Sequence, residues 1–173
     1  MAVDSCSRVV PRLQYLAQGL EILGPPFREP VAILLALETV LIIFMDWVPT
    51  PLNRNISGMT NRERIPSSVI HGTLGVLFAS ANLVHWRWVV LVGALWYTVV
   101  LAQAVRNWWL AYLFGIHSGE IAPDSYRQHY SRNIRFLPRI GDHPVIPDVQ
   151  HVLIHLAVLG AASMSWLSFV DIR

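Results

Sequence analysis

Long apolar runs, separated by short polar segments, dominate the amino-acid sequence. A helix that crosses the hydrocarbon core of a bilayer needs about 20 mostly apolar residues, because each residue advances the helix by about 1.5 Å. Four runs approach that length: residues 31–48, 66–85, 88–105 and 147–169. The pattern therefore predicts an all-α, polytopic membrane protein whose core is a bundle of four transmembrane helices.

Three further segments complete the predicted organisation. Leucines recur at helical spacing in residues 11–23, which predicts an interfacial amphipathic helix within an N-terminal tail of residues 1–30. The third run continues as an amphipathic extension to about residue 116, and the polar residues 117–146 are expected to cap the bundle. Residues 31–173 are interpreted as a single membrane domain.

Composition indicates a lipid environment and argues against nucleic acid as a partner. Hydrophobic residues make up 54% of the chain and charged residues only 14%, whereas soluble domains carry about 25% charged residues. The formal net charge is +2 and the arginines are scattered, so no nucleic-acid-binding surface is predicted. The expected partners are membrane lipid, a lipophilic small molecule or a membrane partner subunit.

The distribution of arginines predicts the orientation of the bundle. The loops of residues 50–65 and 117–147 lie on the same side of the predicted bundle, and they hold more arginines than the segments on the opposite side. By the positive-inside rule, these two loops are predicted to be cytoplasmic.

Ionisable residues inside predicted spans are costly, and they mark candidate functional sites. Glu38 lies in the middle of the first run, and Asp46 lies at its loop-side end. His71 lies near the loop-side end of the second run. The start of the fourth run holds three more such residues: Asp148, His151 and His155.

Helical spacing predicts a metal site among these residues. Positions 148, 151 and 155 share one helix face, and His151 and His155 form an H-x3-H pair that can present two imidazoles to one divalent metal ion. His71 is expected at a similar depth, with Asp46 or Glu120 as a further ligand or general base.

The leading hypothesis is a membrane-embedded enzyme that acts on a lipophilic substrate such as an isoprenoid or a sterol. Its metal-free version uses Glu38 and Asp46 as acid and base. Gln103 and Asn107, near the same end of the third run, are expected to bind a polar head group of the substrate. In span count and length the chain is similar to the emopamil-binding type of small membrane isomerase, although it carries no motif of that family.

Two alternatives remain open. The H-x13-H spacing of His71 and His85 resembles the haem-bearing helices of b-type cytochromes, and this resemblance implies a haem b held by His71 and a histidine of the fourth run, such as His151. The protein would then carry electrons or anchor a redox complex. The other alternative is a non-catalytic subunit whose polar residues bind lipid or a partner protein.

Overall fold

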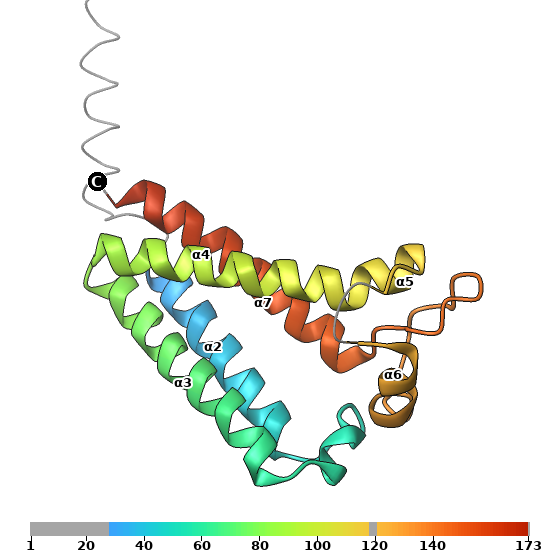
Figure 1. Ribbon diagram of the computed structural model, residues 1–173. Helices are drawn as coiled ribbons and strands as arrows, with labels where there is room; N and C mark the ends of the chain where they lie inside the picture. Colours follow the sequence, from blue (N-terminus) through green and yellow to red (C-terminus); the bar gives the residue numbers. More distant parts are fainter. Residues whose placement is uncertain (1–27, 118–120, 173) are drawn as a thin grey trace, which may run out of the picture.

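The computed structural model describes residues 28–117 and 121–172, and every described regular element is a helix (Figure 1). The interfacial helix predicted in residues 11–23 lies outside the described residues. The long helices are α2 (Arg28–Trp47), α3 (Asn61–Leu83), α4 (Arg87–Ala104) and α7 (Val149–Asp171). The short ones are η1 (Arg54–Gly58), η2 (Val105–Trp109), α5 (Leu110–Phe114) and α6 (Pro123–His129).

Three helical stretches are long and apolar enough to cross a membrane: Arg28–Trp47, Arg87–Phe114 and Val149–Asp171. This finding fits the predicted helical membrane protein. The second predicted span corresponds to α3, which is 23 residues long but does not reach the apolar character of the other three. Its first turns are polar, and His71 and several small polar residues interrupt the rest, so the count of four spans is not confirmed.

The four long helices form two side-by-side pairs (Figure 1). Helix α2 packs along α3, α4 packs along α7, and α7 also contacts α2. A tight turn at His85 joins α3 to α4, and from that turn the two helices diverge (Figure 1). We call this the turn-side end of the bundle. The opposite end, where η1 and α6 lie, is the loop-side end.

Small residues bring the helices close together in the middle of the bundle. A Cβ atom added to Gly75 would lie 1.8 Å from Thr39 Oγ1, and one added to Gly93 would lie 3.0 Å from Phe78 Cγ. Glycine therefore permits the close approach of α3 to both of its neighbours. The buried core beside these contacts contains the apolar side chains of Val31, Leu35, Phe78, Tyr97, Val158, Ala161 and Ala162.

Two local features determine how the helices are arranged at the loop-side end. Helix α3 begins at Asn61, before Pro66, because Glu63 Oε2 accepts a hydrogen bond of 2.7 Å from the backbone N–H of Thr60 and caps the first turn. The helix that begins at Arg87 passes through one π-helical turn at Val105–Trp109 and ends at Phe114, just short of the predicted limit. A π turn inserts one residue into a helix, so it changes which side chains face the bundle.

Candidate functional site

A cavity of about 310 Å³ lies at the loop-side end, between all four long helices. Residues of η1 and Tyr130, which follows α6, also line it. Six side chains that the sequence analysis selected reach this one space: Asp46, His71, Gln103, Asn107, His151 and His155. The structure therefore brings together residues from α2, α3, α4, η2 and α7 that are far apart in the sequence.

Asp148 anchors the most ordered part of the site. It is the N-cap of α7, and its Oδ1 accepts hydrogen bonds from the backbone N–H of His151 at 2.9 Å and from His151 Nδ1 at 2.8 Å. The carboxyl group is completely buried. Its two oxygens accept three hydrogen bonds from His151 and Asn133, and hydrogen bonds of this kind favour the charged form of a carboxyl group. Asp148 therefore faces His151 as a carboxylate.

A second set of contacts ties the two loops to this carboxylate. Asn133 Nδ2 donates to Asp148 Oδ2 at 2.8 Å and to Asn55 Oδ1 at 3.0 Å. The backbone N–H of Asn55 donates to Asn133 Oδ1 at 3.2 Å. Asn55 belongs to η1 and also lines the cavity. The buried side-chain amide of Asn133 therefore joins the segment after α6, to which it belongs, to the loop after α2 and to the start of α7.

Aromatic rings hold His151 in place. The ring centroids of Trp108 and His151 are 3.9 Å apart, with an interplanar angle of 31°. The edge of the Tyr130 ring meets His151 at a centroid distance of 5.2 Å. Because Asp148 fixes one ring nitrogen while Trp108 covers one face, the imidazole has little freedom to rotate. The electron-rich face of the indole also stabilises a positive charge on His151.

The hydrogen bonds give His151 and His155 opposite proton arrangements. In neutral His151, the Nδ1 atom carries the proton that it donates to Asp148, so Nε2 is a free acceptor. In His155, Nδ1 accepts a hydrogen bond of 3.2 Å from Trp109 Nε1, so the proton of a neutral ring lies on Nε2. The two rings are 6.0 Å apart. The cavity thus has a proton acceptor and a proton donor side by side.

The wall formed by α2 and α3 carries one carboxylate, Asp46, and one histidine, His71. Asp46 Oδ2 accepts a hydrogen bond of 3.1 Å from Ser68 Oγ, and Ser68 Oγ in turn accepts one of 2.8 Å from Trp47 Nε1. His71 lies one turn further along α3, with its ring centroid 6.5 Å from that of Trp96. These contacts hold Asp46 and His71 at the cavity wall opposite α7.

Several predicted site residues lie elsewhere. Glu38 is buried between the helices and accepts a hydrogen bond of 3.3 Å from Tyr97 Oη, but it does not line the cavity. His85 lies at the turn-side end, where its Nε2 contacts the guanidinium of Arg28. Glu120 lies outside the described residues. Of the two histidines in the H-x13-H pattern, only His71 reaches the cavity.

The predicted metal site finds no support in the geometry. Among the described residues, no group of three or more His, Cys, Asp and Glu side chains is arranged to hold a metal ion. His151 and His155 are held through their Nδ1 atoms by Asp148 and Trp109, and their ring centroids are 6.0 Å apart. Asp148 itself acts as a helix cap and a partner of His151.

Sequence analysis missed four residues of the site: Trp108, Tyr130, Asn133 and Gln150. A tryptophan near the end of a predicted span is ordinarily explained by the membrane interface, yet Trp108 is buried, with 5% of its surface exposed. Gln150 is a buried amide in the first turn of α7, and its position beside His151 in an apolar run was a usable signal. The positions of Tyr130 and Asn133 depend on the fold of the loop.

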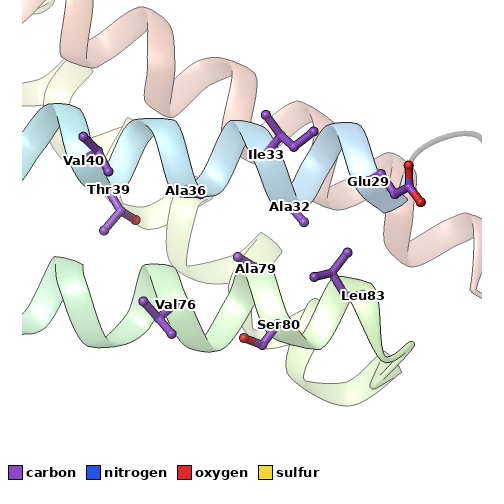
Figure 2. A pocket seen from close by; sticks show the side chains of 10 residues that line it. All are labelled: Glu29, Ala32, Ile33, Ala36, Thr39, Val40, Val76, Ala79, Ser80 and Leu83. Atoms are coloured by element: carbon purple, nitrogen blue, oxygen red, sulfur yellow. The ribbon is translucent and has the colours of Figure 1, made fainter.

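A larger hollow, of about 610 Å³, lies between α2 and α3 and is distinct from the site (Figure 2). Its lining is almost entirely apolar or small; Ala32, Ala36 and Ala79 are examples (Figure 2). Among the described residues, Glu29, at one end, is the one ionisable side chain that lines it. By size alone, this groove would be the stronger candidate for a functional site. The ionisable side chains converge in the smaller cavity instead, so any acid or base chemistry is expected there.

No family model matches the chain, and the searches of curated proteins and of solved structures found no match either. Function is therefore inferred from the residues of the cavity.

Proposed function

We propose that the protein is a membrane-embedded enzyme that catalyses proton transfer on a lipophilic substrate, at the cytoplasmic end of the bundle. The observation that carries this proposal is the Asp148–His151 pair: the buried Asp148 carboxylate holds His151 Nδ1 at 2.8 Å, and His151 lines a polar cavity. A base oriented by a carboxylate, next to a space for a substrate, is the arrangement that general base catalysis requires.

His151 is the general base. Its Nε2 removes a proton from a substrate carbon that lies between a C=C bond and a carbonyl group. The electron pair of the broken C–H bond forms a new C=C bond to the carbonyl carbon, and the π electron pair of the C=O bond moves onto the oxygen. The imidazolium that forms is stabilised by the Asp148 carboxylate at 2.8 Å and by the Trp108 face at 3.9 Å. Both partners are in position before the reaction, so no protein group has to reorganise when the charge appears.

His155 stabilises the other end of the electron shift. Its Nε2–H donates a hydrogen bond to the substrate oxygen on which negative charge develops. His151 then returns its proton to the same carbon or to a different one. Return to a different carbon yields an isomer, so the reaction needs no co-reactant. Asp46 and His71 on the facing wall keep the substrate between α3 and α7.

The exchange of substrate hydrogen for deuterium tests this proposal. The protein, in lipid nanodiscs prepared in D₂O, is incubated with a total lipid extract, and the lipids are analysed by mass spectrometry. We expect one lipid class to gain deuterium with the wild-type protein. The rate should fall by about 10²- to 10⁴-fold in His151→Gln, the usual contribution of a general base.

His129→Gln is the matched control, because His129 is an exposed histidine on α6 that does not line the cavity. It should exchange deuterium at the wild-type rate. Equal exchange by the wild-type protein and His151→Gln, or no exchange by the wild-type protein, would overturn the proposal.

A further inference from the structure

The seams between the long helices are not equally closed around the cavity. The α2–α3 seam is closed by the hydrogen bonds of Ser68 with Asp46 and Trp47. The α4–α7 side is closed where η2 meets α7, by the hydrogen bond of Trp109 with His155 and the ring contact of Trp108 with His151. The two loops meet over the loop-side end through Asn55 and Asn133.

The α3–α4 seam differs from these. Toward the turn, Gly93 packs against Phe78, and the ring of His71 contacts that of Trp96. Nearer the loop-side end the two helices diverge (Figure 1). There the cavity is lined by Ser67, His71, Val100 and Gln103, and Gln103 is also exposed, so the cavity reaches the surface between α3 and α4. We call this stretch of the seam the α3–α4 window.

The outer rim of the window carries exposed apolar side chains. Next to its edges, Ile70 on α3 is 47% exposed and Val99 on α4 is 53% exposed. Exposed apolar side chains on helices of this kind are expected to contact the hydrocarbon of the bilayer. Gln103, a cavity residue, is itself exposed at this seam. A molecule dissolved in the membrane can thus reach the cavity from the side.

The charges of the cavity restrict the head group of such a molecule. Asp46 is an acid, and no arginine is among the residues that line the cavity in the described part of the chain. Phosphate and carboxylate groups are usually bound by arginine or lysine, because burying an unpaired anion beside another carboxylate is costly. The remaining polar lining consists of amides, hydroxyls and imidazoles, which suit an uncharged head.

We infer that the cavity takes an uncharged lipid with an oxygen-bearing head, which enters from the bilayer through the α3–α4 window. Its substrate is a long-chain ketone, and a long-chain alcohol is an unreactive analogue that binds in the same place. This inference rests on the proposed function, because it names the substrate class of the proposed enzyme. Binding of the lipid can nevertheless be measured without any reaction. The hydrocarbon chain lies in the window, and the head lies among His71, His151 and His155.

Photolabelling tests the inference directly. The protein in nanodiscs is irradiated with a long-chain alcohol that carries a diazirine near its hydroxyl end, and labelled residues are located by mass spectrometry. We expect labels on cavity residues such as Gln103 and Asn107. The phosphate ester of the same alcohol should label these residues at least about tenfold less. A tenfold change in affinity corresponds to only ~1.4 kcal/mol, and burying an unpaired anion costs at least that much.

A pair of neighbouring variants shows whether the probe uses the window. Val100→Trp fills the edge of the window, whereas Val99→Trp adds the same bulk at an adjacent position that does not line the cavity. Labelling of Asn107 should fall about tenfold in Val100→Trp and stay unchanged in Val99→Trp. Near-equal labelling in the two variants, or equal labelling by the phosphate ester, would overturn the inference.

The two proposals can fail separately. If photolabelling follows the expected pattern but deuterium exchange is absent, the cavity binds an uncharged lipid without proton transfer. If exchange occurs but labelling does not depend on Val100, the enzyme takes its substrate from the loop side.

Discussion

The two ends of the bundle use the same four helices in opposite ways. At the turn-side end, buried polar groups bond to each other: Asn82 Nδ2 donates to Phe78 O at 2.8 Å, and Ser168 Oγ donates to Asn82 Oδ1 at 2.6 Å. Residues Ala81, Val90 and Ile172 pack around them. At the loop-side end, by contrast, polar side chains from every long helix surround a cavity.

The difference follows from the side chains at the helix contacts. Gly75 and Gly93 allow close packing from the middle of the bundle toward the turn. At the other end, the larger rings of Trp108, His151 and His155 line the cavity in place of such close contacts. Small residues thus close one end, and large polar and aromatic residues surround the cavity at the other end.

The largest effect on stability is expected at Asp148. Asp148→Ala removes the α7 cap and leaves His151 and Asn133 without their acceptor. We expect the free energy of unfolding to fall by about 3 kcal/mol, of which about 1 is the cap and about 2 the unpaired donors. Chemical unfolding in detergent measures the change. Asp142→Ala, at an exposed loop position, is the control and should be neutral.

The closed part of the bundle is probed at two glycines of α3. Gly75→Ala should destabilise the protein by about 2 kcal/mol, because the new methyl group meets Thr39 Oγ1 at 1.8 Å and forces α2 and α3 apart. Gly72→Ala is matched in residue type and helix, but its nearest neighbour is Ile43 Cδ1 at 3.5 Å. Thermal unfolding should therefore separate the two variants, and equal midpoints would contradict the packing argument.

The link between the loops gives a smaller effect, confined to the open end. Asn133→Ala breaks the hydrogen bonds to Asp148 and Asn55 and should cost about 1–2 kcal/mol. Hydrogen exchange should become faster in η1 and at the start of α7 while the exchange in α4 stays the same. Faster exchange throughout the bundle would mean that the loops support the whole fold.

The smallest effect is expected at the start of α3, where pH is the variable. Hydrogen bonds from the backbone N–H and the hydroxyl of Thr60 lower the pKa of Glu63. When the pKa of a carboxyl group is lower in the folded protein than in the unfolded chain, its charge stabilises the folded state at pH values above the unfolded-state pKa. This stabilisation is lost as the pH falls through the folded-state pKa. Wild-type protein should therefore lose more stability than Glu63→Gln between about pH 6 and about pH 3. Parallel losses in thermal unfolding would contradict this expectation.

The sequence predicted the composition of the site better than its chemistry. Apolar runs and their interruptions identified Asp46, His71, His151 and His155 at one end of the bundle, because depth along a helix can be counted in residues. The same count suggested a metal among the histidines. It could not show that His151 bonds to Asp148 and His155 to Trp109, since that depends on helix rotation and on the π turn.

Two further expectations depend on facts that position along a helix does not give. Glu38 was expected to act as an acid or base because it lies mid-span, and the structure places it beside Tyr97 and away from the cavity. His71 and His85 were singled out by their spacing on one helix, and the structure places one at the cavity and the other at the turn.

The anchoring of the base at the start of α7 has a consequence for biosynthesis. Helices α2, α3 and α4 are translated before α7, and they supply Asp46, His71 and Gln103 but neither member of the Asp148–His151 pair. The nascent chain can therefore begin to fold in the membrane before it holds the proposed base, since chains fold from their N-terminal part as they emerge. On the proposed mechanism, reactivity would start only after α7 is inserted and Asn133 has met Asp148.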